Sequence, residues 1–90
     1  MTATATALLQ FIDHHARTAD ASSIGVDTPG GESDRCARAL FKTPSGSFTV
    51  LAVVAVKGEE GPELEAEIWR DDDAAMDRST VWLRERGVPC

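Results

Sequence analysis

No stretch of this sequence is long and apolar enough to cross a membrane, and the longest apolar run covers only residues 50–56. A transmembrane helix needs about 20 consecutive apolar residues. The N-terminal residues Met-Thr-Ala-Thr-Ala-Thr also lack the basic stretch that opens a signal peptide. The sequence therefore predicts a cytoplasmic protein.

Cysteine is scarce, and Cys36 and Cys90 form no closely spaced pair of the kind that binds zinc. In a reducing compartment we expect two free thiols; in an exported protein the alternative is a disulfide that ties the C-terminus to the sheet. Asp13, His14 and His15 add no metal site, because neighbouring residues on a helix diverge by ~100°. We expect neither a metal nor another cofactor.

Signatures of enzymes are missing as well. No phosphate-binding loop, dinucleotide fingerprint, nucleophile elbow or kinase pattern is present. Residues 28–31 (Thr-Pro-Gly-Gly) form a turn, not a phosphate cradle, because no capped helix with a lysine follows them. Carboxylates are plentiful, but a catalytic carboxylate pair needs a deep cleft, which a chain of 90 residues rarely supplies. We therefore expect no enzymatic activity and no catalytic residues.

Basic residues are almost missing from residues 59–77, which hold nine carboxylates and a single arginine, Arg70. The net charge of this acidic block is −8, whereas the formal net charge of the whole protein is −6. The rest of the chain is therefore slightly basic, and the acidity is local. A surface of one sign steers or repels charged partners. The carboxylates belong to Glu59, Glu60, Glu63, Glu65, Glu67, Asp71, Asp72, Asp73 and Asp77.

The periodicity of apolar residues predicts one α+β domain over residues 1–90. An N-terminal helix is expected at 4–19, and a loop with a turn at its centre follows it. A C-terminal helix follows 71–73, which offer an N-cap, and ends at Gly87, with Met76, Ser79, Trp82 and Leu83 on its inward side. Between the helices we expect an antiparallel β-meander with strands at 36–42, 48–57 and 63–69, and a fourth strand if 23–26 forms one.

One segment of this meander has an alternative. Residues 34–40 contain alanine, arginine and leucine, which favour helix, and Ser33 would cap such a helix. The sequence leaves both a strand and a short helix open at this place.

The central strand is apolar on both sides, so both faces of the sheet should be covered. Phe48, Val50, Ala52, Val54 and Val56 face one way, and Thr49, Leu51, Val53 and Ala55 face the other. The cover for the second face is a helix that crosses over, the long loop, or a second molecule. In the last case, Leu51, Val53 and Ala55 would form the interface of a homodimer.

The strand at 63–69 is expected to turn Leu64, Ala66 and Ile68 to the core and Glu63, Glu65, Glu67 and Trp69 outward. Side chains two apart on a strand are separated by ~6.6 Å, so its outward side carries a regular row of carboxylates. This row has about half the linear charge density of one strand of duplex DNA. The acidic residues on either side of the row bring its charge density closer to that of DNA.

An acidic outer face also protects an edge strand from aggregation, and aspartates at a helix start act as caps. This ordinary role is the alternative to a binding site. The near-absence of compensating lysine or arginine favours the binding site, because solvated surfaces usually mix the two signs.

We therefore expect the acidic block to dock on a basic site of a partner protein, most simply as an inhibitor that competes with nucleic acid by imitating its charge. Small size and concentrated acidity resemble phage-encoded nucleic-acid mimics such as anti-CRISPR and anti-restriction proteins. Direct binding of nucleic acid is not expected, because such a surface repels phosphate. Two alternatives stay open: a dimerising structural or regulatory domain, and an immunity protein or antitoxin that blocks a basic enzyme.

Overall fold

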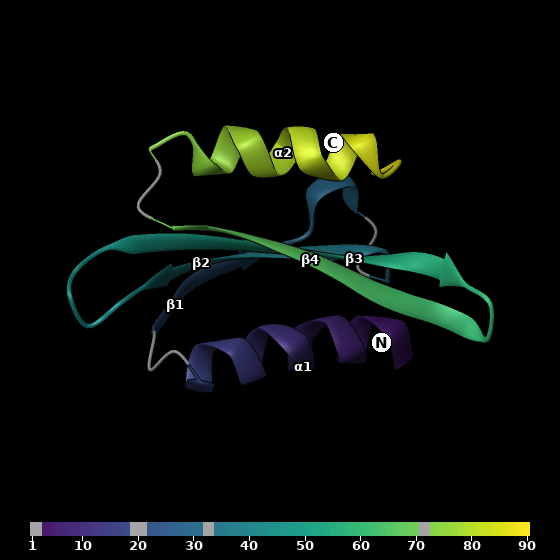
Figure 1. Cartoon of the computed structure of the whole chain (residues 1–90), viewed down its shortest axis with the longest axis horizontal. Coiled ribbons are helices and arrows are strands. Elements are labelled where there is room, and N and C mark those ends of the chain that lie inside the picture. Colours follow the sequence, from purple (N-terminus) through teal and green to yellow (C-terminus); the bar gives the residue numbers. More distant parts are fainter. Residues whose placement is uncertain (1–2, 19–21, 32–33, 71–72) are drawn as a thin grey trace.

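The computed structural model describes residues 3–18, 22–31, 34–70 and 73–90. Two helices enclose a four-stranded antiparallel sheet, one helix on each face (Figure 1). This is the expected α+β fold, and the short strand at 23–26 does form. The elements are α1 (Ala3–Thr18), β1 (Ser22–Asp27), the 3-10 helix η1 (Pro29–Gly31), β2 (Cys36–Lys42), β3 (Phe48–Gly58), β4 (Gly61–Arg70) and α2 (Ala75–Glu85).

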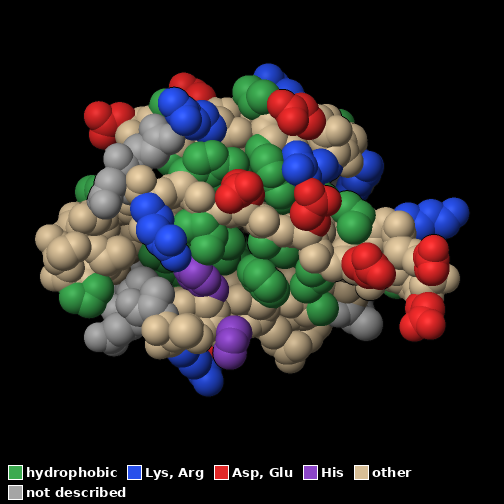
Figure 2. Space-filling model, in the orientation of Figure 1, with side chains coloured by type: hydrophobic (Ala, Val, Ile, Leu, Met, Phe, Trp, Pro, Cys, Tyr) green, Lys and Arg blue, Asp and Glu red, His purple; other side chains and the backbone are tan. Residues whose placement is uncertain are grey.

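The strands lie in the order β1-β2-β3-β4, so that β1 and β4 are the two edges of the sheet. β3 and β4 form the longest hairpin, with 11 and 10 residues, and Gly58 pairs with Gly61 across its turn. The tip of this hairpin extends beyond both helices and carries acidic side chains (Figures 1 and 2). Much of β4 is therefore exposed, which matters for the site described below.

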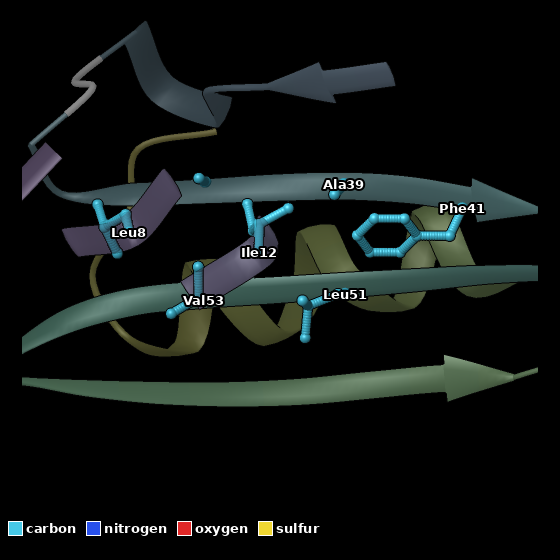
Figure 3. Close-up of a cluster of buried hydrophobic side chains, with 7 residues drawn as sticks. Leu8, Ile12, Ala39, Phe41, Leu51 and Val53 are labelled. Atoms are coloured by element: carbon cyan, nitrogen blue, oxygen red, sulfur yellow. The ribbon is translucent and has the colours of Figure 1, made fainter. Parts of the chain in front are cut away.

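α1 covers the face of the sheet that carries Leu51 and Val53 (Figure 3). Leu8 and Ile12 lie one helical turn apart on α1, so both point into this cluster, and each is at most 4% exposed. Alternate residues of β2 and β3 complete it, as the two-residue period of a strand requires. These partners are Ala37, Ala39, Phe41, Leu51 and Val53.

α2 covers the opposite face, where Leu83 and Val88 pack against Cys36, Ala52 and Val54. The end of this helix follows its sequence signal. Gly87 has a φ of 88°, and its N–H donates to the Arg84 carbonyl at 3.0 Å. The Val88 N–H donates to the Leu83 carbonyl at 3.1 Å, which completes a Schellman motif and places Val88 in the core.

The structure decides between the two alternatives at 36–42 in favour of the expected strand, and it corrects the expected start of α2. Residues 36–42 form strand β2 and not a helix, because β2 pairs with strands on both sides and buries alternate side chains there, which outweighs helix propensity. Ser33 lies outside the described residues. α2 begins after Ala74, which makes no side-chain cap bond, so Asp73 stands one residue too early to cap it. Met76 is also exposed rather than inward.

The sequence did not determine which element covers the second face of β3. In the structure this element is α1 of the same chain. Leu51 and Val53 are both 0% exposed beneath it. A second molecule is not needed to cover this face, and a homodimer through it would require α1 to leave the sheet. Neither α1 nor α2, within the described residues, is long and apolar enough to span a membrane.

Candidate partner-binding surface

The acidic row, defined here as Glu63, Glu65 and Glu67, lies on β4. These residues pair with Val56, Val54 and Ala52 of β3, so they project from the α2 side of the sheet. All three are exposed, because α2 packs over β3 and does not extend across the whole of β4. Figure 2 shows acidic side chains that follow the line of β4 toward the tip of the hairpin.

The rest of the acidic block falls into two groups. Glu59 and Glu60 form the exposed turn between β3 and β4 and so continue the acidic row to the tip of the hairpin. Asp73 and Asp77 are exposed at the start of α2. Asp71 and Asp72 lie outside the described residues. The hairpin therefore brings together five of the nine predicted carboxylates, which are Glu59, Glu60, Glu63, Glu65 and Glu67.

One of these carboxylates has a basic partner that the sequence did not indicate. Arg86, at the end of α2, places its Nε 2.8 Å from the Glu65 Oε1. Its guanidinium group also lies 3.8 Å from the centroid of the Trp82 ring, and Nη1 donates to the Trp82 carbonyl at 3.0 Å. A partly exposed ion pair of this kind contributes up to about 1 kcal/mol. The pair joins the middle of the acidic row to α2.

A shallow groove of ≈ 370 Å³ lies between the end of the acidic row and α2. Trp69, Val81 and Trp82 form its apolar part, and the two indole rings meet edge-to-face with centroids 6.0 Å apart. Two carboxylates and one basic residue complete its lining, namely Asp77, Glu85 and Arg78. Aromatic faces beside carboxylates suit the aliphatic stem and the cationic head of lysine or arginine. Trp69 was expected to face outward with the glutamates; it shares their side of the sheet but is half-buried against Trp82.

The backbone of β4 has an unpaired edge. The Ala55 N–H donates to the Arg35 carbonyl at 2.8 Å, on the side of β3 away from β4. Opposite residues of an antiparallel pair exchange either both hydrogen bonds or none, so Leu64, the partner of Ala55, turns its backbone groups outward. The same parity applies to Ala66 and Ile68. The Ile68 N–H agrees with it, since it donates to the carboxylate of neighbouring Glu67 at 3.2 Å.

Pro62 supports this assignment of the edge. It pairs with Lys57 and has the same parity as Leu64, so the N–H that proline lacks would have faced outward. Proline is tolerated in a strand where the missing donor faces solvent. The free edge, defined as the outward backbone of Leu64, Ala66 and Ile68, therefore runs beside the acidic row.

The other candidate residues do not form a site. His14 is exposed, whereas His15 is half-buried with its ring 6.0 Å from that of Phe41. Burial lowers the pKa of His15, and the positive charge of Arg70 and the neighbouring His14 lower it further. Among the described residues, no group of three or more His, Cys, Asp or Glu side chains is arranged to hold a metal ion.

No family model, curated protein or solved structure matches this chain. The surface around β4 is the part of the described structure where exposed charge, an apolar groove and unpaired backbone meet. Sequence reasoning predicted its carboxylates and treated their strand as an edge strand, but it missed Arg86 and Val81. Arg86 is 21 positions from Glu65, so no local pattern links them. Pro62 within the strand is a further signal for the edge, beside its acidic outer face.

Proposed function

We propose that this protein is a non-enzymatic binding protein that docks the acidic face of β4 on a basic site of a partner protein. In the form that we favour, it is an inhibitor that imitates the charge of nucleic acid. The observation that carries the proposal is the concentration of exposed carboxylates on one hairpin. The β3–β4 hairpin holds five carboxylates against two basic residues, Lys57 and Arg70.

Electrostatics explains what such a hairpin does in solution. The three carboxylates of the acidic row repeat at the ~6.6 Å spacing of alternate strand residues, and the acidic turn extends them. A local negative field raises the rate of encounter with a basic surface and disfavours nucleic acid itself. The site in the partner would then be one that ordinarily receives phosphate groups.

An immunity protein or antitoxin would use the same electrostatics against a basic toxin or enzyme. The nature of the partner separates the two functions. A nucleic-acid mimic and nucleic acid exclude each other from one site, whereas an immunity protein is indifferent to nucleic acid unless its target binds it.

The experiment is capture of partners on the immobilised protein from a nuclease-treated bacterial lysate, with elution in a salt gradient. We expect a nucleic-acid-binding protein that is released as salt rises, because salt screens exposed charges. Added DNA or RNA should prevent its capture. Capture of a basic enzyme that ignores added nucleic acid would favour the immunity function. An empty column, with the protein itself running as a salt-resistant dimer, would contradict the proposal.

A further inference from the structure

We propose that β4 receives an extended, basic segment of the partner protein, which adds to the sheet as a fifth strand along the free edge. This inference rests on the proposed function and names how the acidic surface would be occupied. It commits to a protein segment in which basic and apolar side chains alternate.

Unpaired backbone is the first support for this inference. Leu64 and Ala66 turn their N–H and C=O groups to the free edge, and residues 61–67 are exposed throughout. Ile68 is different, because its N–H is already bonded to the Glu67 carboxylate. An extended peptide that pairs with such an edge gains main-chain hydrogen bonds, and its alternate side chains give specificity.

The side chains of β4 indicate which residue types the added peptide should carry at its alternate positions. On the α2 side, an added strand would lie beside the acidic row, which favours basic side chains. On the α1 side it would lie beside Leu64 and Ala66, of which Leu64 is 37% exposed, and this favours apolar side chains. Trp69 follows Glu67 on the α2 side, so a further basic side chain would reach the groove formed with Trp82.

Charge also indicates whether the free edge is occupied by a segment of a partner protein or by a second copy of this chain. Two β4 strands that paired across a twofold axis would place the acidic rows of both copies side by side on the same face. Like charges directly opposite each other on neighbouring strands are destabilising. The acidic row therefore opposes pairing of this edge with itself and favours a basic occupant.

The direct test uses a synthetic heptapeptide that alternates lysine and valine, and a control peptide of the same composition with the lysines in one block. We expect the alternating peptide to bind at least tenfold more tightly. Amide exchange of Leu64 and Ala66, followed by NMR in the wild-type protein, should slow when it binds. Equal binding of both peptides, or unchanged exchange at these two amides, would overturn strand addition.

A pair of variants tests the backbone by itself. Ala66→Pro removes one outward N–H, and Ala66→Val keeps it and favours strand structure. We expect Ala66→Pro to weaken binding of the alternating peptide at least tenfold and Ala66→Val to leave it within twofold. Circular dichroism establishes that both variants fold; if Ala66→Pro does not, amide exchange in the wild-type protein decides the question.

Failure of this inference can be told from failure of the proposed function. Neutralising Glu63 and Glu67 together tests charge, and Ala66→Pro tests the edge. If neutralisation abolishes capture of the partner and Ala66→Pro does not weaken it, the acidic surface is the site and strand addition is wrong. If neither change weakens capture, both proposals fail.

Discussion

Cys36 and Cys90 lie on the same side of the sheet, but their surroundings differ. Cys36 is 0% exposed, and its Sγ donates to the Pro29 carbonyl at 3.2 Å. Burial raises the pKa of the Cys36 thiol to about 11, and the nearby Cys90 and Asp27 raise it as well. Cys90 is half-buried near the C-terminus. Both are free thiols, as the sequence predicted for a reducing compartment.

We predict that a thiol reagent such as 5,5′-dithiobis(2-nitrobenzoate) labels one cysteine of the folded protein at pH 8 and both after unfolding. At this pH, a thiol with a pKa of about 11 is ionised in only about one molecule in a thousand, and burial excludes the reagent. The Cys90→Ser variant should show no rapid labelling. Rapid reaction of Cys36 in that variant would contradict its burial.

His15 gives the fold a dependence on pH. Its pKa in the folded protein lies below the ordinary value of 6.5, because of burial first and then the charges of Arg70 and His14. The unfolded chain therefore binds a proton more readily, and stability is lost as pH falls below 6.5 toward the folded pKa.

We predict that, as pH falls from 7.5 to 5, the melting temperature of the wild type decreases relative to that of His15→Gln. His14→Gln is the control, because His14 is exposed on the same helix. Its difference from wild type should change with pH less than that of His15→Gln, because His14 is only the last of the three causes that lower the pKa of His15. Parallel curves for wild type and His15→Gln would mean that His15 is not desolvated in the fold.

Among the elements, β3 depends most on its helical covers. Its Leu51 is 0% exposed beneath α1, whereas Phe48, in the same strand, is 54% exposed. A charge placed at position 51 would be buried without a partner, whereas a charge placed at position 48 would reach solvent.

We predict that Leu51→Asp unfolds the protein, because an uncompensated buried charge costs about 3–5 kcal/mol and small domains are only marginally stable. Phe48→Asp should keep the fold. Circular dichroism and sedimentation of both variants measure this. A folded, monomeric Leu51→Asp protein recovered from a dimeric wild type would instead favour the homodimer interface over Leu51, Val53 and Ala55.

The sequence predicted most elements because each has a local signal. The periodicity of apolar residues predicted α1, and Gly87 predicted the end of α2. The choice between strand and helix at 36–42 could not be made locally, because pairing with β1 and β3 decides it. The start of α2 was misjudged because a run of aspartates offers several caps, and Ala74 was used instead.

At the scale of the whole molecule, the two apolar faces of β3 could be predicted from the sequence, but the helix that covers each face could not. That choice depends on how the chain crosses the sheet, which involves contacts far apart in sequence. For the acidic surface, too, the local features could be predicted and the contacts between distant residues could not. Its carboxylates were predicted from their spacing, and their strand was expected at an edge, whereas the Arg86–Glu65 ion pair follows from the position of α2.

The molecule thus carries its acidic row on an edge strand and buries most of its apolar surface between the sheet and the two helices. If the acidic row is the binding site, the position of the charge should matter more than its total. Glu63→Gln/Glu67→Gln and Asp13→Lys both change the formal net charge from −6 to −4. The double variant acts on β4 and leaves the Glu65–Arg86 ion pair in place. Asp13→Lys acts on the outward side of α1, where it removes the exposed ion pair with Arg17.

The most direct measurement is the affinity of the captured partner for the wild type and for these two variants at one ionic strength. We predict that Glu63→Gln/Glu67→Gln weakens binding at least tenfold and that Asp13→Lys changes it less than threefold. Equal weakening by both variants would mean that only net charge matters. Unchanged binding by Glu63→Gln/Glu67→Gln would contradict a binding site on the acidic face of β4.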